Sequence, residues 1–164
     1  MNYNDQFSVA GDPADANSND LFEQAKAYHL GVGVNQDMLK AASLYREAMD
    51  HGDKKAKHNL AMIYISQEGE LADKATGIQM LQELANEGSA ESIYSLGGCY
   101  MNGNGVTQDI DKGLELYHTA SDMGLGAATY AIGAYYANEC QEIEKGIQYC
   151  EKAAEQGFAL AASI

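Results

Sequence analysis

The chain has 164 residues, 46% hydrophobic and 21% charged, a composition that supports a packed core and argues against wholesale disorder. With 24 acidic and 10 basic residues its formal net charge is −14, which argues against binding to nucleic acid or to an anionic membrane. No apolar run approaches the roughly 18 residues that span a bilayer, and three cysteines do not form a disulfide framework, so we expect a cytoplasmic protein.

The first 19 residues are expected to form an acidic, disordered leader. They contain Asp5, Asp12 and Asp15, and no Lys or Arg occurs through position 20. Because the segment also lacks a continuous apolar stretch, it does not resemble a secretory signal or a transit peptide.

Residues 20–164 contain an internal repeat with a period of 36 residues, most easily seen in a tyrosine column. The tyrosines are Tyr28, Tyr64, Tyr100 and Tyr136, and a small residue precedes each by three places. The segment GVGVNQD (31–37) matches GNGVTQD (103–109). The repeat units are therefore predicted near 21–56, 57–92, 93–128 and 129–161, the fourth being three residues shorter.

Apolar residues at three- and four-residue spacing predict two helices in each unit. The first helices are predicted at 21–30, 57–66, 93–102 and 129–138, and the second helices at 38–51, 74–87, 110–123 and 142–156. Asp37 and Asp109 are placed to cap second helices at their N-termini. Gly52, Gly88, Gly124 and Gly157 are placed where a helix ends in a left-handed residue.

Two helices cannot bury both of their faces alone, so the units are expected to stack into an all-α solenoid of about four two-helix repeats. A partial fifth helix is predicted to follow, up to residue 164. Tyr64 and Tyr100 are expected to be largely buried with Leu60 and Leu96. Gly97 is expected at a close helix crossing. Val34 and Val106 are expected to tuck their loops into the core.

These columns resemble the Sel-one-like repeat (SLR) family of the tetratricopeptide-like superfamily. The third unit carries the pattern best, at Leu96, Gly97, Tyr100, Gly103, Gly105, Val106, Asp109, Lys112, Gly113, Tyr117, Ala120 and Gly124. The first unit matches from Ala25 to Gly52, whereas the second has Gln67 and Glu70 in place of the loop Gly and Val. The resemblance implies an adaptor that gathers protein partners.

The resemblance also implies that the first helices line a concave groove. Residues on these helices at three- and four-residue spacing form one stripe that we predict to bind a protein partner. The predicted binding residues are Phe22, Lys26, His29, His58, Met62, Ile65, Tyr94, Met101 and Tyr130. Tyr94 is the favoured anchor, because Gly98 should leave room above it. The alternative is that these side chains simply cover the next repeat.

Acidic residues concentrate on the second helices and the turns after them. They are Glu47, Asp50, Glu83, Glu87, Glu115, Asp122, Glu151 and Glu155. They would form either an ordinary solvated face or an electrostatic surface that attracts a basic partner.

No motif indicates catalysis, a cofactor or a metal. Gly31-Val-Gly33 and Gly103-Asn-Gly105 lack the strand and the Gly-Lys-Ser/Thr of a phosphate loop, so they are predicted to be turns between helices. No histidine pair has His-x-x-x-His spacing. Cys99 is expected to be a buried thiol, and Cys140 lies in the shortened loop.

Three functions remain at this stage. The first is a noncatalytic scaffold or adaptor that binds a protein or peptide in its groove, and the acid excess favours a basic partner. The second is an acidic immunity or inhibitor protein that neutralises a basic toxin or enzyme. The third is a hydrolase like the cysteine-rich branch of the resembling family, which is linked to β-lactam hydrolysis. The chain lacks both the cysteine pairs of that branch and a Ser-x-x-Lys nucleophile motif.

Overall fold

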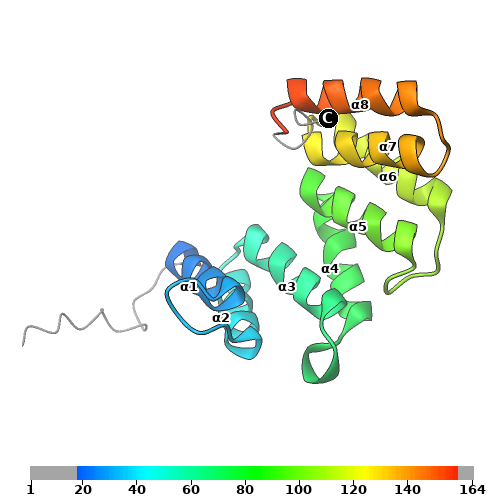
Figure 1. The fold of residues 1–164 in the computed structure, drawn as a ribbon. Helices are drawn as coiled ribbons and strands as arrows, with labels where there is room; N and C mark the ends of the chain where they lie inside the picture. The colour runs from blue at the N-terminus through cyan, green and yellow to red at the C-terminus, as the bar shows by residue number, and fades with distance from the viewer. Residues whose placement is uncertain (1–17, 159–164) are drawn as a thin grey trace, which may run out of the picture. The chain divides into compact units, whose positions relative to one another are not determined.

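The structure is a computed structural model that describes residues 18–158, and every regular element in that range is helical (Figure 1). Its first four α-helices are α1 (Ser18–Leu30), α2 (Met38–Asp50), α3 (Lys54–Ser66) and α4 (Lys74–Asn86). The remaining four are α5 (Ala90–Asn102), α6 (Ile110–Asp122), α7 (Gly126–Asn138) and α8 (Ile143–Glu155). A short 3₁₀ helix, η2 (Gly69–Leu71), lies between α3 and α4. The predicted all-α class and its helix pairs are confirmed.

The chain divides into two compact units, Met1–Lys57 and His58–Ile164, here named the N-terminal and C-terminal units. In the N-terminal unit α1 packs against α2. In the C-terminal unit α5 packs against α6 and α7 against α8, while contacts of α4 with α5 and of α6 with α7 join consecutive repeats. Helix pairs therefore both form and stack within the C-terminal unit.

Local capping defines the second helices. The side chains of Asp37, Asp73 and Asp109 accept hydrogen bonds from the backbone N–H three residues ahead, at 2.9, 3.1 and 3.0 Å. The glycines that follow the second helices are Gly52, Gly88, Gly124 and Gly157, and all have φ between 85° and 92°. The predicted caps at Asp37 and Asp109 and the predicted left-handed glycines are confirmed.

The first helices begin three residues earlier than the periodicity predicts, at Ser18, Lys54, Ala90 and Gly126. Two unrecognised N-caps explain this difference for α3 and α5. Asp53 accepts a hydrogen bond from the Ala56 N–H at 2.9 Å, and Ser89 accepts one from the Ser92 N–H at 3.2 Å. The extra turn is polar at most positions, so apolar spacing alone does not reveal it.

Each helix pair crosses at small residues. A Cβ added to Gly97 would lie 2.7 Å from Cδ1 of Tyr117 and 3.1 Å from the carbonyl oxygen of Gly113. A Cβ on Gly77 would lie 2.7 Å from the oxygen of Ala61, and a Cβ on Gly133 would lie 2.9 Å from the oxygen of Gly146. The predicted close crossing at Gly97 is confirmed, and the same contact recurs along the C-terminal unit.

The tyrosine column is less buried than predicted. Leu60 and Leu96 are only 1% exposed, but Tyr64 and Tyr100 are half-buried. The backbone carbonyls of these tyrosines accept hydrogen bonds from the N–H groups of Asp73 and Asp109 at the starts of the second helices. The Lys112 ammonium lies 4.4 Å from the centre of the Tyr100 ring. The rings therefore lie at the edge of each helix pair rather than inside it.

The prediction that Val34 and Val106 enter the core is wrong for Val34, which is 38% exposed, while Val106 is half-buried. The glycine-rich loops are turns between helices, as predicted, and their glycines have positive φ. Residues 1–17 of the predicted leader and 159–164 of the predicted fifth helix lie outside the described residues.

Adjacent glycines of α5 provide a matched stability test. Gly97→Ala should destabilise the fold by about 1–3 kcal/mol, because the methyl group would overlap the Tyr117 ring. Chemical denaturation monitored by circular dichroism measures this difference.

Gly98→Ala is the control, since its methyl group would meet only the Tyr117 hydroxyl, at 3.5 Å. That variant should be neutral or gain up to about 1 kcal/mol from helix propensity. Equal effects at both positions would contradict a close crossing at Gly97.

Candidate functional site

The predicted stripe starts with one ring-bearing residue near the beginning of each first helix, and all four are half-buried. In the N-terminal unit, Phe22 of α1 packs on Tyr45 of α2, with ring centres 5.7 Å apart. In the C-terminal unit, Tyr94 of α5 lies 5.2 Å from Tyr117 of α6, and Tyr130 of α7 lies 5.2 Å from Phe158. Part of each ring is therefore fixed by a neighbour, and part remains accessible.

Tyr94 does not have the free space that Gly98 was expected to provide. The Tyr117 hydroxyl lies over Gly98, 3.5 Å from the place that a Cβ would occupy. Burial raises the pKa of Tyr94, and it raises the pKa of Tyr117 to about 12, with Tyr94 and Cys99 adding to the shift. Both phenols are therefore neutral at physiological pH, and Tyr117 limits the positions that Tyr94 can take.

His58 is tied to α5 rather than free in the stripe. Its Nδ1 lies 2.9 Å from the Ser92 hydroxyl, and the Ser89 hydroxyl donates to the Ser92 oxygen at 3.0 Å. The Ser92 hydroxyl therefore links Ser89 at the start of α5 to the His58 ring. Burial lowers the pKa of His58 and so favours the neutral imidazole, although the charge of Glu91 opposes this shift.

Ile65 is a correction to the predicted site. It is 2% exposed, and its Cγ1 occupies the notch at Gly77, where a Cβ would lie 2.6 Å away. The side chain thus fills the space between α3 and α4 and is not available to a partner.

The two stripe methionines, Met62 and Met101, are half-buried. Met101 packs over Gly113 of α6, where an added Cβ would lie 2.6 Å from its Cγ and Sδ atoms. A thioether side chain adapts its shape readily to a bound surface, so these positions suit contact with a partner.

Two predicted residues, Lys26 and His29, belong to the N-terminal unit. Lys26 is exposed, with its Nζ 4.0 Å from Oε2 of Glu23, and this surface pair contributes little to stability. His29 lies with its Nδ1 3.4 Å from the Tyr45 hydroxyl. The part of the stripe that lies in one unit is therefore His58, Met62, Tyr94, Met101 and Tyr130.

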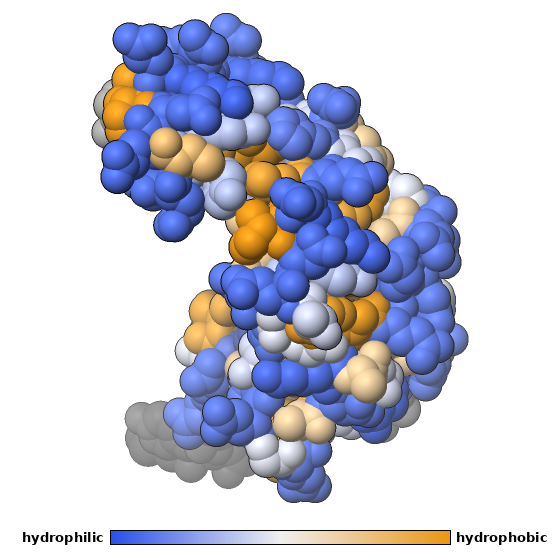
Figure 2. Space-filling model, turned by 90° about the vertical axis from the view of Figure 1, so that its right-hand side faces the viewer, coloured by the Kyte–Doolittle hydropathy of each residue, from blue (hydrophilic) through white to orange (hydrophobic). Residues whose placement is uncertain are grey.

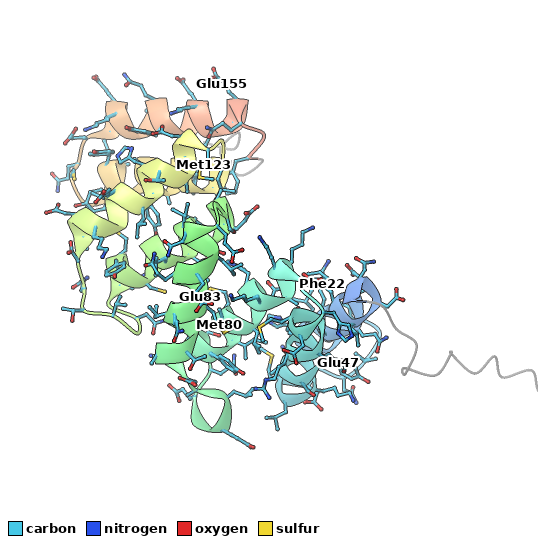
Figure 3. All side chains as sticks on the ribbon, turned by 180° about the vertical axis from the view of Figure 1, so that it is seen from behind. Phe22, Glu47, Met80, Glu83, Met123 and Glu155 are labelled. Carbon is cyan, nitrogen blue, oxygen red and sulfur yellow. The ribbon has the colours of Figure 1, made fainter. Side chains whose placement is uncertain are left out.

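Charge is divided unevenly between the units, a feature that the whole-chain sum conceals. Residues 58–158 carry 15 acidic and 4 basic side chains, a net charge of −11, whereas residues 18–57 carry six of each. All the second-helix and turn acids named from the sequence are exposed, including Glu83 and Glu155, which Figure 3 labels. Figure 2 shows one face covered largely by hydrophilic residues, with apolar residues in small patches.

Sequence reasoning missed Tyr117 and Phe158 as neighbours of the stripe. Tyr117 lies 72 residues, or two repeat periods, after Tyr45, so the repeat pattern could have indicated an aromatic residue at this position. Phe158 was not, because its contact with Tyr130 depends on where the chain turns after α8.

The chemistry of the described residues gives no metal or disulfide centre. Residues 18–158 contain no group of three His, Cys, Asp or Glu side chains that could hold a metal ion. Within that range Cys99 and Cys150 are buried free thiols with pKa values raised by burial, and Cys140 is exposed. The predicted burial of Cys99 is confirmed. No helix among the described residues is long and apolar enough to cross a membrane.

Comparison with known families identifies the repeat. The family model described as Sel1 repeat matches residues 21–53, 54–89, 90–125 and 127–158. Among curated proteins no relative matches significantly.

Several solved structures share the fold. A Sel1 repeat protein from Oxalobacter formigenes is 25% identical with a TM-score of 0.69, and the match covers 88% of this chain and 60% of that one. A protective antigen of uropathogenic Escherichia coli with an SLR fold is 27% identical, with a TM-score of 0.67, over 88% of this chain and 32% of that one. An immunity protein from Pseudomonas aeruginosa, 23% identical with a TM-score of 0.66 over 88% and 55% of the two chains, shows the fold alone. The chain thus spans less than two thirds of each of these proteins.

The burial of His58 predicts a pH-dependent stability. An unfolded histidine binds a proton near pH 6.5, whereas folded His58 binds it at a lower pH. Its stabilising contribution is therefore complete above pH 6.5 and is lost as the pH falls through the lowered folded pKa. Urea unfolding between about pH 7.5 and pH 5 should show this decline, before most carboxylates titrate.

His58→Gln should flatten the decline, and His51→Gln, at an exposed position, serves as the matched control. An unchanged slope in His58→Gln would show that His58 is not held neutral in the fold.

Proposed function

Because the chain belongs to the Sel1 repeat family, we propose that it is a noncatalytic scaffold that binds a segment of a partner protein along the first helices of its C-terminal unit. The observation that carries this proposal is the state of the stripe residues Met62, Tyr94, Met101 and Tyr130. Each is half-buried, so each combines a fixed position with an accessible surface. Anchor residues of protein interfaces have these properties.

Fixed side chains favour binding because less conformational entropy is lost when the partner arrives. Tyr117 restricts Tyr94, and Phe158 restricts Tyr130. Both anchors are tyrosines, which supply an apolar ring together with a hydroxyl that can bond to a peptide backbone. The methionines of the stripe would adapt to the side chains of the partner. The partner segment should therefore carry apolar residues spaced to meet the two rings.

The charge of the C-terminal unit adds a requirement on that partner. A net charge of −11 over residues 58–158 would attract a basic protein and repel an acidic one. We therefore propose a basic partner whose apolar segment meets the stripe.

The same charge favours a second candidate function. The exposed acids of the second helices could themselves bind a basic protein, as an inhibitor would, and the stripe would then be structural. The two candidates place the partner on different helices, so substitutions separate them.

A partner captured from the native cell should lose affinity when Tyr94 is truncated. Tyr94→Ala should weaken binding by about 2 kcal/mol, because an anchor ring is removed from the interface. Isothermal titration calorimetry measures the change, with the helical circular dichroism signal as a check on folding. Tyr117→Leu is the control, since it disturbs the same ring pair from the buried side. An equal loss in both variants would mean that packing, and not contact with the partner, explains the effect.

Charge and salt should affect the rate of association rather than the rate of dissociation. Reversing Glu115 and Glu151 to Lys should slow association with the partner. Added salt should slow association of the wild-type protein, because both changes weaken electrostatic steering of a basic partner. The dissociation rate should stay nearly constant in surface plasmon resonance. A large rise in dissociation rate with intact Tyr94 would support the inhibitor function instead.

A further inference from the structure

One loop of the repeat array docks on the preceding repeat in a defined way. A Cβ added to Gly105, in the loop between α5 and α6, would lie 3.0 Å from Cγ1 of Ile78 and 3.2 Å from Cβ of Lys74. The Gly-x-Gly-Val loop of the third repeat therefore rests on the first two turns of α4. This contact shows how a Gly-x-Gly-Val loop docks on the start of a second helix.

The matching loop of the first repeat, residues 31–37, has no such support from the residues that the structure describes. Gly33 corresponds to Gly105, but within residues 18–158 no neighbouring side chain or backbone lies within 4 Å of an added Cβ there. Val32 is 66% exposed and Val34 is 38% exposed, and the flanking Leu30 and Leu39 are exposed as well.

This loop is also more apolar than its counterpart. Leu30, Val32 and Leu39 stand where the third repeat has polar residues. Those counterparts are Asn102, Asn104 and Asp111. Exposed apolar residues grouped in this way are typical of an interaction surface.

A surface equivalent to the receiving one is exposed on the last helix of the described range, α8. Ile143 and Ile147 of α8 occupy the repeat positions of Lys74 and Ile78, and they are 55% and 46% exposed. The same positions of α6, Ile110 and Leu114, are half-buried.

A hollow of about 650 Å³ adjoins this surface. It is lined by Gln141, Glu142, Ile143, Glu144, Lys145 and Gln148. The start of α8 thus offers an apolar surface beside a space that a loop could enter.

We propose that a second copy of this chain docks its 31–37 loop on Ile143 and Ile147, so that copies associate head to tail. A second copy is the occupant because it carries the matching loop. Within one chain, the Gly105 loop already rests on the same two helix positions, Lys74 and Ile78 of α4. Charge also favours this arrangement. It places the electrically balanced residues 18–57 of one copy against the acidic residues 58–158 of the next, whereas two α8 surfaces facing each other would join two charges of −11.

Sedimentation velocity of the full chain, from micromolar to near-millimolar concentration, tests the proposal. Association should rise with concentration and with salt, because salt screens the repulsion between chains of net charge −14. Val32→Asp and Ile147→Asp should each weaken self-association at least tenfold. Met123→Asp, at an exposed apolar residue outside both surfaces, should associate as the wild type does.

An equimolar mixture of the two variants distinguishes head-to-tail contact from other modes. Ile147→Asp retains its loop and Val32→Asp retains its α8 surface, so the mixture should form a one-to-one dimer that cannot grow further. A wild type that stays monomeric at every concentration and salt would overturn the proposal, as would a mixture that fails to associate. If the wild type were monomeric and the Ile147→Asp variant had a lower Tm than the wild type, residues 159–164 of the same chain would be the occupant instead.

Discussion

The close approach of two helices at small residues is the contact on which each repeat depends. In the C-terminal unit, Gly77, Gly97 and Gly133 leave no room for a side chain at the crossing, because backbone oxygens or aromatic carbons already lie within about 3 Å of an added Cβ. In the N-terminal unit Ala25 and Ala41, at the same repeat positions, are fully buried. Larger residues would separate the helix axes and remove the contacts on both sides of the crossing.

The crossing also sets the chemistry of the candidate surface. When α5 and α6 approach at Gly97 and Gly113, the Tyr117 ring meets Tyr94 and its hydroxyl covers Gly98. Met101 is brought over Gly113 by the same approach. The stripe is therefore half-buried for a structural reason, and its accessible parts are held in place by the contacts that stabilise the repeat. The same residues therefore serve the fold and the proposed function. For this reason a substitution of a stripe residue is compared with one of its buried neighbour, such as Tyr117 for Tyr94.

The sequence was sufficient for features set by local chemistry or by residue volume. The 36-residue period predicted the helix pairs, the caps at Asp37 and Asp109, and the crossing at Gly97. It was insufficient where a side chain's environment depends on a distant helix. Ile65 fits the stripe by spacing, but it fills the notch that Gly77 leaves in α4. The earlier helix starts depended on caps at Asp53 and Ser89, which apolar periodicity does not record. The division of charge between the units could have been found by counting along the chain.

The central claim, that a partner binds the first helices of the C-terminal unit, can be tested directly with methionine methyl groups. Met62 and Met101 lie in the stripe, whereas Met80 of α4 is buried and Met123, which follows α6, is exposed. Figure 3 labels Met80 and Met123. Methyl NMR spectra of the ¹³C-methionine-labelled chain should be recorded during titration with the captured partner. If the partner binds the stripe, the Met62 and Met101 signals should shift most and the Met123 signal should stay in place. A shift of Met123 with unchanged Met62 and Met101 signals would contradict it and would place the partner on the second helices.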